Sequence, residues 1–454
     1  MSRLVVVSNR VADPRKPGAG GLAVALGEAL QASGGLWFGW SGKVIDDGAD
    51  SPLNTQRSGP VTLATVDLAR ADHDTYYLGY SNGVLWPVFH YRLDLADFDA
   101  GDIEGYRRVN RMLAHRLQPL LRPDDLIWVH DYHLIPLAAE LRAMGCQQRM
   151  GFFLHIPLPP RTILAAIPHS AWLMRSLMMY DLIGFQTEGD VEHFAAYVVH
   201  EDSGEQRDDH EFRVHGRSVR ARAFPIGIDV DDFQALGLQA DAQDTWRTMR
   251  EQHTNRQLLV GVDRLDYSKG MPQRVRAFRR LLEHFPQNRR SATLIQVAAP
   301  SREDVEAYAD LRHEMESLCG AVNGDFGELD WMPVRYMRRA VPRRRLPGLY
   351  AACCVGLVTP LRDGMNLVAK EYVAAQDPAD PGVLVLSRFA GAAETMRDAL
   401  IVNPYDIDGS AEAIQQALRM PLDERRVRHT RLLAGLRAQD VHWWAQAFLT
   451  ALRG

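Results

Sequence analysis

Short apolar runs alternate with amphipathic segments along most of the chain. The runs Leu4–Ser8, Asp125–His130 and Met150–Leu154 are almost continuously apolar, as expected of strands that are buried on both faces of a parallel sheet. The segments that follow them place apolar residues three or four positions apart, which predicts helices. A strand followed by a helix, repeated many times, is typical of a doubly wound α/β domain.

This alternation stops in a polar stretch near residues 230–245 and then begins again. The second half contains five further predicted strands: Leu258–Val262, Thr293–Ala298, Cys354–Val358, Val383–Leu386 and Leu400–Val402. A chain of 454 residues is long enough for two hydrophobic cores. We therefore predict two Rossmann-like doubly wound domains, residues 1–235 and 236–440, with a last helix at 440–454 that packs back on the first domain.

Composition narrows the class of protein. The chain is 46% hydrophobic and 24% charged with a net charge of -5, which argues against nucleic acid or an anionic membrane as a partner. There is no apolar run of membrane-spanning length, and the chain begins with a strand rather than a signal peptide, so we expect a cytoplasmic protein. The four cysteines have neither C-x-x-C nor disulfide spacing and are interpreted as reduced and structural.

The loop between the strand Cys354–Val358 and a predicted helix Leu367–Gln376 is the first candidate site. It contains Asp363, Gly364 and Asn366, and free N–H groups at a helix N-terminus bind anions. Lys370 and Glu371 follow within the helix. A carboxylate suits sugar hydroxyls and the amides suit phosphates, so together they favour a nucleotide sugar, although Lys370 and Glu371 would also fit a solvated helix face.

A second loop, Asp263–Gly270, places Arg264 and Lys269 between a strand and a helix. Two cations there suit a diphosphate and would neutralise the charge of a departing nucleoside diphosphate. The chain has only four lysines, Lys16, Lys43, Lys269 and Lys370, which favours a specific need for the ammonium over a surface salt bridge. Arg302 and Arg10 follow two other strands and suit the phosphate of an acceptor.

The first half carries candidate groups of a different kind. Asp131 stands at the end of a predicted strand, where catalytic groups of α/β proteins collect, and prolines hold His155 in a rigid loop. His130 and His133 lack a third ligand at metal spacing, so we expect no metal site. The glycines at 18–21 open a predicted helix (residues 22–31) and suit a phosphate or sugar, or are a plain flexible loop.

Two aromatic segments complete this half. The first, residues 34–42, has the sequence GGLWFGWSG and is interpreted as a hairpin or pocket wall. The second, residues 76–91, is explained mostly by core packing, with a few rings left to stack on a sugar.

Eight motifs in order along the chain carry a resemblance to one family. They are SNR at 8–10, AGGL at 19–22, LWFGWSG at 36–42, LWP-x-FHYR at 85–92, WVHDYHL at 128–134, FFLHIP at 152–157, VDRLDYSKG at 262–270 and LRDGMNLVAKEYVAAQ at 361–376. In these segments the chain resembles the trehalose-6-phosphate synthases, and the match extends from residue 1 to about residue 405.

The resemblance implies the GT-B architecture, with two Rossmann-like domains facing across a cleft that holds the active site. It implies a retaining glucosyltransferase that moves glucose from a nucleoside-diphosphate glucose, usually UDP-glucose, to glucose 6-phosphate, giving α,α-trehalose 6-phosphate. It also implies a reaction that requires no metal or other cofactor. Oligomeric state and physiological role, whether osmoprotection or carbon storage, stay open, and a homo-oligomer is compatible with the family.

The resemblance further implies a role for each matched residue. The acceptor set is Arg10, Trp40, Tyr77, Trp86, Asp131 and Arg302. The donor set is Gly20, Gly21, His155, Arg264, Lys269, Val341, Asp363, Gly364, Met365, Asn366, Leu367, Val368 and Glu371. Within these sets, the resemblance implies catalytic roles for Asp131, His155, Arg264, Lys269 and Asp363.

The chain departs from the family pattern in three places. Leu158-Pro159-Pro160-Arg161 replaces the usual continuation after His155, the region 199–222 is short, and residues 334–347 are rich in arginine. The third departure lies where the family binds the donor base, so uracil, guanine and adenine stay open. Two alternatives also stay open: a related transferase with another acceptor such as glycerol 3-phosphate, and a catalytically silent sugar-phosphate sensor. A Rossmann oxidoreductase is disfavoured because the dinucleotide fingerprint is absent.

Overall fold

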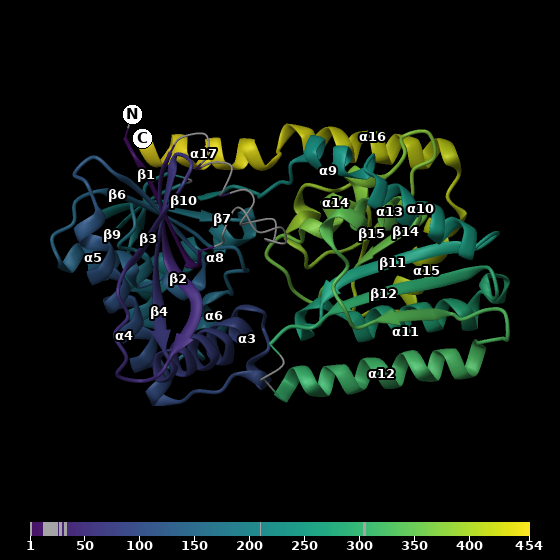
Figure 1. Cartoon of the computed structure of the whole chain (residues 1–454), viewed down its shortest axis with the longest axis horizontal. Coiled ribbons are helices and arrows are strands. Elements are labelled where there is room, and N and C mark those ends of the chain that lie inside the picture. The colour runs from purple at the N-terminus through teal and green to yellow at the C-terminus, as the bar shows by residue number, and fades with distance from the viewer. Residues whose placement is uncertain (1, 12–25, 27–29, 31–33, 209, 303–305) are drawn as a thin grey trace. The chain divides into compact units, whose positions relative to one another are not determined.

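The computed structural model describes residues 2–11, 26, 30, 34–208, 210–302 and 306–454. It divides the chain into two compact units, Met1–Pro225 with His442–Gly454, and Ile226–Val441 (Figure 1). Residues 226–235, which we expected in the first domain, belong to the second unit. The reason is packing: helix α9 (Val230–Gly237) contacts helices α13 and α14 of the second unit, and Lys370 Nζ donates to the Ile226 carbonyl at 2.6 Å.

The first unit is built on one sheet with the strand order β3-β4-β2-β1-β5-β6-β7-β10-β9-β8. Its seven central strands are parallel, and the strands at both ends pair antiparallel. The strands are β1 Leu4–Arg10, β2 Gly35–Ile45, β3 Asn54–Ser58, β4 Val61–Ala69, β5 Leu126–His130, β6 Arg149–Phe153, β7 Leu182–Phe185, β8 Glu205–Gln206, β9 Glu211–Val214 and β10 Arg217–Ala223.

Helices of this unit connect and cover these strands. They are α2 Arg70–Asp72, the π-helix η1 His73–Leu85, α3 Trp86–Phe89, α4 Ala100–Leu117, α5 Leu137–Ala143, α6 Arg161–Leu164, α7 Ser170–Leu177 and α8 Glu188–Glu201, with short 3-10 turns at Leu93–Leu95, Gln118–Leu120 and Tyr132–Leu134. The helix expected at 22–31 lies mostly outside the described residues.

The second unit has one fully parallel six-stranded sheet with the order β13-β12-β11-β14-β15-β16. Its strands are β11 Gln257–Arg264, β12 Ala292–Ala299, β13 Val334–Met337, β14 Val355–Val358, β15 Val383–Ser387 and β16 Leu400–Val402. Its helices are α9, α10 Ala240–Gln252, α11 Met271–His284, α12 Glu306–Phe326, α13 Leu346–Ala351, α14 Leu367–Ala375, α15 Ile407–Arg419 and α16 Leu422–Ala438, with 3-10 turns at Tyr267–Lys269, Pro286–Asn288, Arg343–Arg345 and Gly391–Glu394.

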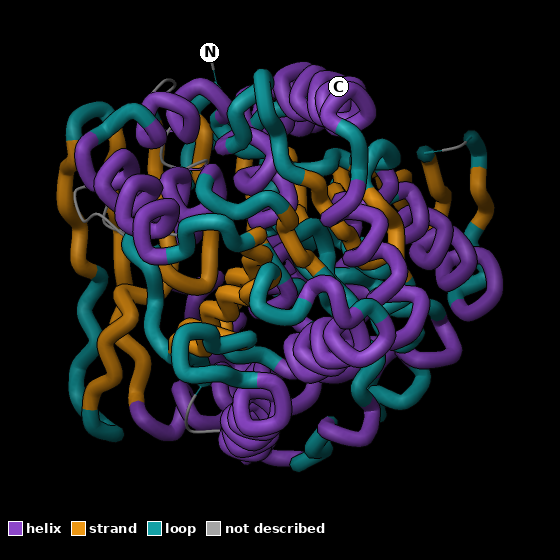
Figure 2. Tube along the Cα trace, turned by 90° about the vertical axis from the view of Figure 1, so that its right-hand side faces the viewer, coloured by secondary structure: helices purple, strands orange, loops and turns teal. Residues whose placement is uncertain are grey.

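Helices lie on both faces of this sheet. Figure 1 shows α11 and α12 on one face and α13, α14 and α16 on the other. In Figure 2, orange strands near the centre of the view lie between purple helices. Strand β12 is buried over almost its whole length, as its continuous apolar run predicts. The prediction of two doubly wound α/β domains is confirmed.

The last helix, α17 (Val441–Arg453), packs on the sheet of the first unit. Its rings Trp444 and Phe448 are fully buried and contact Trp128 at centroid distances of 4.9 and 4.6 Å. A Cβ on Gly151 or Gly184 would meet the Phe448 ring at 2.8 or 2.7 Å. Two strands of the sheet therefore lack side chains where this ring lies.

Of the two interpretations of the first aromatic segment, hairpin or pocket wall, the hairpin was wrong. The segment GGLWFGWSG is not a hairpin: it forms β2, which lies between β1 and β4 and is parallel to both. Burial explains the difference, because Trp37 and Phe38 are almost completely enclosed and Trp37 Nε1 donates to Ser8 Oγ at 2.8 Å. The aromatic-rich segment that follows β4 is helical, as η1 and α3.

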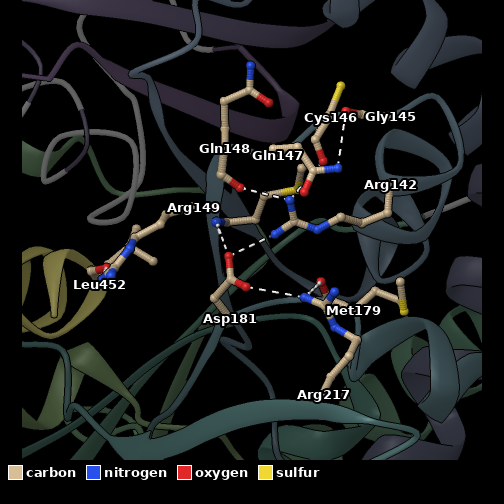
Figure 3. Close-up of polar contacts among 11 residues, drawn as sticks. Arg142, Gly145, Cys146, Gln147, Gln148, Arg149, Met179, Asp181, Arg217 and Leu452 are labelled. Atoms are coloured by element: carbon tan, nitrogen blue, oxygen red, sulfur yellow. Dashed lines mark hydrogen bonds and ion pairs between the residues drawn. The ribbon is translucent and has the colours of Figure 1, made fainter.

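The amino-terminal edge of the first sheet is closed by a polar network (Figure 3). Asp181 accepts from Arg142 at 2.8 Å and from Arg217 at 3.2 Å, and Arg149 donates to the Leu452 carbonyl of α17 at 3.2 Å. The ion pairs of Asp181, its hydrogen bond from the Met150 N–H and the hydrogen bond from Arg149 to α17 connect the beginnings of β6, β7 and β10 with the last helix. Within the described part of the chain, no helix is both long and apolar enough to cross a membrane.

Candidate active site

In each unit the candidate residues gather at the carboxyl edge of the sheet. The chain runs from β1 to β2 on one side and later returns to place β5 on the other, so the strand order reverses at β1. In the second unit the order reverses in the same way at β11, between β12 and β14. Such switch points open a crevice at the carboxyl ends of the strands, where α/β proteins bind ligands.

Arg10 is the last residue of β1 and is exposed. It pairs in register with Trp40 of β2, and a Cβ on Gly42 would lie 2.5 Å from Arg10 Nε. Gly42 has a φ of 88°, so glycine both permits this backbone and leaves room for the guanidinium. Arg10 and Trp40, two of the predicted acceptor residues, therefore stand side by side at the switch point.

Asp131 follows β5 in a backbone conformation that is rare outside glycine, with φ 74° and ψ 164°. Such a conformation costs about 1–3 kcal/mol and persists only where its surroundings enforce it. Here the Asp131 N–H donates to the Phe153 carbonyl at 2.8 Å, and Asp131 Oδ1 accepts from the backbone N–H groups of Tyr132 and His155 at 3.0 and 3.3 Å. The carboxylate is thereby held at the ends of β5 and β6.

Aromatic rings surround this edge. Tyr77, from η1, lies 5.6 Å from Trp40 and stacks on His133 at 5.8 Å, as measured between ring centroids. Trp86 is buried and lies 5.9 Å from Tyr132. The structure therefore brings the predicted rings Trp40, Tyr77 and Trp86 to the same side of the sheet as Asp131.

His155 and His130 form a pair. His130 Nδ1 and His155 Nε2 are 3.1 Å apart. Burial lowers the pKa of His155 to about 3, and burial together with the neighbouring ring lowers the pKa of His130 well below its usual range. Both imidazoles are therefore neutral at physiological pH. We excluded a metal role for His130 from sequence spacing, but its hydrogen bond to a site residue had no sequence signal.

In the second unit, two loops at the switch point are bonded to each other. The Leu361 N–H donates to the Ser268 carbonyl at 2.7 Å. Gly270 adopts a left-handed φ of 63°, and a Cβ there would lie 2.2 Å from the Thr359 carbonyl oxygen. The loop after β11 and the loop after β14 therefore form one continuous surface.

Lys269 and Asp363 connect these loops through their side chains. Lys269 Nζ lies 2.6 Å from Asp363 Oδ2, and both side chains are nearly nine-tenths buried. Asn366 donates to the same carboxylate oxygen at 2.9 Å and caps α14 by accepting from the Ala369 N–H at 3.3 Å. Asn366 has a φ of 80°. Three predicted donor residues thus form one hydrogen-bonded group at a helix N-terminus.

Two arginines lie beside this group. Arg264 is the last residue of β11 and is exposed. Arg302 follows β12 with a φ of 48°, and its guanidinium donates to Tyr308 Oη at 2.8 Å. Tyr308 in turn donates to the buried Asp266 at 3.2 Å. The Arg302 side chain is therefore oriented by a buried carboxylate of its own unit.

Arg274, which sequence reasoning missed, ties the strand ends under both loops. Its side chain is fully buried. It donates to Asp263 Oδ2 at 2.7 Å, to Gln296 Oε1 at 3.1 Å and to Thr359 Oγ1 at 3.0 Å, which are groups of β11, β12 and the segment after β14. A Cβ on Gly261 would meet Arg274 Nη1 at 2.3 Å. The only sequence hints were a glycine inside β11 and an arginine on an apolar helix face.

Lys370 and Glu371 in α14 are not a solvated helix face. Lys370 is buried, and burial lowers the pKa of its ammonium to about 7. Its Nζ points to the Ile226 carbonyl rather than into the loops. Glu371 lies beside Tyr350, whose hydroxyl is 3.4 Å from Oε2, and burial raises the pKa of Glu371 to about 7. Only Glu371 of this pair is near the candidate site.

Residues at two of the departures from the family pattern make contacts within the folded units. Leu158 is buried and its N–H donates to Asp190 Oδ1 at 2.9 Å. In the arginine-rich segment, Arg343 pairs with Asp232 at 2.9 Å and Arg344 with Asp241 at 2.9 Å. These arginines bind α9 and α10.

The other predicted donor residues are distributed as follows. Gly364 and Met365 are buried in the loop, Leu367 and Val368 begin α14 with partial exposure, and Val341 is partly exposed before the turn Arg343–Arg345, while Gly20 and Gly21 lie outside the described residues. No three His, Cys, Asp or Glu side chains of the described residues come together in a way that could hold a metal ion.

Solved structures with the same fold define the class. One is an α,α-trehalose-phosphate synthase (UDP-forming) from Burkholderia xenovorans in complex with glucose-6-phosphate, with a TM-score of 0.96, 50% identity and coverage of 100% of both chains. Another is from E. coli and is described as bound with UDP-2-fluoro glucose, with a TM-score of 0.95, 47% identity and 99% coverage of both chains. The protein is a glycosyltransferase of the GT-B class, which combines two Rossmann-like domains.

The family model of glycosyltransferase family 20 matches residues 6–454. The chain belongs to this family. It is 50% identical to the trehalose-6-phosphate synthase of Sinorhizobium fredii over 456 residues, which cover 100% of this chain and 98% of that protein. It is 47% identical to the enzyme of the same name from Sodalis glossinidius, with coverage of 100% and 96%.

Proposed function

We propose that this glycosyltransferase is a trehalose-6-phosphate synthase that moves glucose from UDP-glucose to the anomeric hydroxyl of glucose 6-phosphate, giving α,α-trehalose 6-phosphate. One observation carries the proposal: Asp131, Lys269 and Asp363, three of the predicted catalytic residues, lie in loops at the carboxyl ends of the strands that form the two switch points. Full-length likeness to UDP-forming synthases supports the choice of substrates.

On the donor side, we assign the diphosphate to Arg264 and Lys269 and the N-terminus of α14. Cations and free N–H groups at one helix end suit two phosphates. Asp363 is anchored by Lys269 and Asn366, so its remaining acceptor positions are oriented for glucose hydroxyls. Glu371 is assigned to the ribose, and the segment around Val341 to the base.

On the acceptor side, we assign the phosphate of glucose 6-phosphate to Arg10, Tyr77 and Arg302. Trp40 and Trp86 provide apolar ring surface for the sugar, and Asp131 accepts from its hydroxyls. The strained backbone at Asp131 supports a functional role, because such conformations persist where geometry is needed.

We propose a displacement on one face of the donor sugar. The bond between the anomeric carbon and the diphosphate oxygen breaks, the acceptor oxygen bonds to the same carbon on the same face, and the acceptor proton passes to the departing diphosphate oxygen. Lys269 and Arg264 stabilise the negative charge that grows on the diphosphate. Because side chains supply this charge, we also propose that no metal is needed.

The test is the release of nucleoside diphosphate from UDP-, GDP- and ADP-glucose, each with and without glucose 6-phosphate, in the presence of EDTA. We expect release that depends on the acceptor, is fastest with UDP-glucose and gives an α,α-linked product by NMR. Glycerol 3-phosphate in place of glucose 6-phosphate tests the alternative acceptor. If a folded protein releases no nucleoside diphosphate with any donor and acceptor, the proposal is contradicted, and a catalytically silent sugar-phosphate sensor becomes the favoured interpretation.

A further inference from the structure

Two histidines from neighbouring strands meet behind the carboxyl edge of the first sheet. His130 is the last residue of β5, and His155 follows β6 by two positions. A polar contact joins their rings, from His130 Nδ1 to His155 Nε2 at 3.1 Å. His130 Nε2 is buried and has no hydrogen-bond partner among the described residues.

The surroundings of the pair are mainly aromatic. His130 lies 4.6 Å from Trp128 and 6.3 Å from Trp444, and His155 lies 4.6 Å from Phe153, as measured between ring centroids. The carboxylate of Asp131 accepts from the backbone N–H of His155, not from either ring. Within the described part of the chain, no carboxylate is hydrogen-bonded to either ring in a way that would stabilise an imidazolium.

Two neutral imidazoles in contact must share one proton, since each ring carries one N–H and one bare nitrogen. If His155 donated through Nε2, His130 would carry its proton on Nε2, a buried donor with no acceptor among the described residues. If His130 donates through Nδ1, its buried Nε2 is a bare nitrogen. Buried orphan N–H groups are rarer than under-used acceptors, which favours the second arrangement.

We propose that His130 is a positioning residue that donates its Nδ1–H to His155 Nε2 and thereby fixes His155 as the tautomer protonated on Nδ1. His155 then presents an N–H donor, not an acceptor, to the transferred sugar. This inference rests on the proposed function only in assigning His155 to the donor glucose. The tautomer itself is a property of the protein without substrate.

The first experiment observes the tautomer directly. Protein labelled with ¹⁵N-histidine is examined by long-range ¹H–¹⁵N correlation spectra at neutral pH, and the His155 signals are identified as those missing from His155→Gln. We expect a single His155 tautomer protonated on Nδ1, and a mixture of tautomers in His130→Phe. A wild-type His155 protonated on Nε2, or an unchanged tautomer in His130→Phe, would overturn the proposal.

The second experiment uses steady-state kinetics with UDP-glucose and glucose 6-phosphate. Loss of a group that orients a site residue costs about 10–100-fold in activity, so we expect that decrease in kcat for His130→Phe, with little change in the KM for glucose 6-phosphate. His130→Gln keeps an N–H donor and should recover part of the activity. Equal kcat values for His130→Phe and His130→Gln would contradict the proposal.

A matched control separates positioning from folding. His253 is also buried and has one ring contact, to Arg335 at 2.7 Å in the second unit. His253→Phe should lower the thermal midpoint but leave kcat unchanged. If no donor is turned over at all, the proposed function fails while the tautomer measurement still decides the role of His130.

Discussion

The two switch points are built from opposite chemistry. At the first, buried neutral imidazoles, aromatic rings and one carboxylate held by backbone N–H groups meet, and the exposed Arg10 stands beside them. At the second, the groups that meet are ion pairs: Lys269 with Asp363, and Arg274 with Asp263 beneath them. Both edges have the same strand topology, so the fold did not impose this difference.

The difference supports our proposed assignment of the ligand parts to the two units. Neutral donors and acceptors in a desolvated edge discriminate hydroxyl positions without attracting charge. Buried cations, by contrast, stabilise an anion strongly because the surroundings screen them poorly. The buried part of the first edge therefore suits sugar hydroxyls, with the exposed Arg10 beside it for the acceptor phosphate, and the second edge suits the diphosphate together with the glucose hydroxyls proposed for Asp363. The predictions below test whether this division holds.

The largest expected effect is on stability, at Arg274. Removing one partner of a buried ion pair costs about 3–5 kcal/mol because the other charge stays buried, so Arg274→Met should lower the free energy of unfolding by that amount in urea titrations. The double variant Arg274→Met with Asp263→Asn removes both charges and should recover part of the loss. If the double variant loses as much free energy of unfolding as Arg274→Met and Asp263→Asn lose together, the two residues do not interact and the pairing is contradicted.

The next effect is on catalysis, at Lys269. Loss of one group that stabilises transition-state charge costs about 10²–10³-fold in kcat, and we expect this range for Lys269→Ala. Lys269→Ala leaves the Asp363 carboxylate with its hydrogen bond from Asn366 but without its cation. The double variant Lys269→Ala with Asp363→Asn removes both charges, and its free energy of unfolding tests whether the lost ion pair destabilises the single variant. If the activity of Lys269→Ala decreases only in proportion to the fraction of protein that is folded, Lys269 has no direct role in catalysis.

A smaller effect is the pH dependence of stability, which has opposite signs for His155 in the first unit and Glu371 in the second. Burial lowers the pKa of His155 to about 3 in the folded protein, so the unfolded chain binds more protons below about pH 6.5, and stability falls as pH falls from there. Glu371 has the opposite sign: its pKa is raised to about 7, so the folded state holds a proton and stability rises as pH falls from about 7 to 4.5. Each slope is about 1.4 kcal/mol per pH unit per proton.

The measurement is chemical denaturation between pH 4.5 and 7 for wild type, His155→Gln and Glu371→Gln. We expect His155→Gln to lose less stability on acidification than wild type, and Glu371→Gln to lose more. Identical pH slopes in all three proteins would show that neither group titrates differently on folding.

The smallest expected effect is at a surface ion pair, which serves as a control for the variants above. Arg161 and Glu201 form a surface pair at 2.6 Å in which both side chains are about two-fifths exposed, and exposed pairs contribute about 0–1 kcal/mol. Arg161→Ala should therefore change neither kcat nor the free energy of unfolding by more than that. A loss of several-fold in kcat would reveal a role for the departure at residues 158–161.

Local patterns predicted the framework because a buried parallel strand has a continuous apolar run. Strand β16 begins and ends at the predicted residues Leu400 and Val402. The same patterns led to a wrong hairpin at β2, since glycines that flank tryptophans are equally typical of turns. The domain limit was placed about ten residues late, because the contact that assigns Ile226 is made by Lys370, far away in the chain.

Candidate site residues could be proposed from the sequence where one loop contains several chemical groups together, as with Lys269 or Asp363. Residues that contact a partner in another element could not be found in this way. His130 and Arg274 act through residues that lie 25 and 85 positions away. Their partners become neighbours only when parallel strands align, and hydrophobic periodicity carries no information about that register.

The return of α17 to the first unit has a consequence for synthesis on the ribosome. Residues 441–453 are translated only after the whole of residues 226–440, yet Trp444 and Phe448 fill the layer over Gly151 and Gly184. Until residues 441–453 are made, the first unit lacks the two rings that pack against Trp128, and with them part of its apolar core. The first unit is therefore begun before the second unit and completed after it.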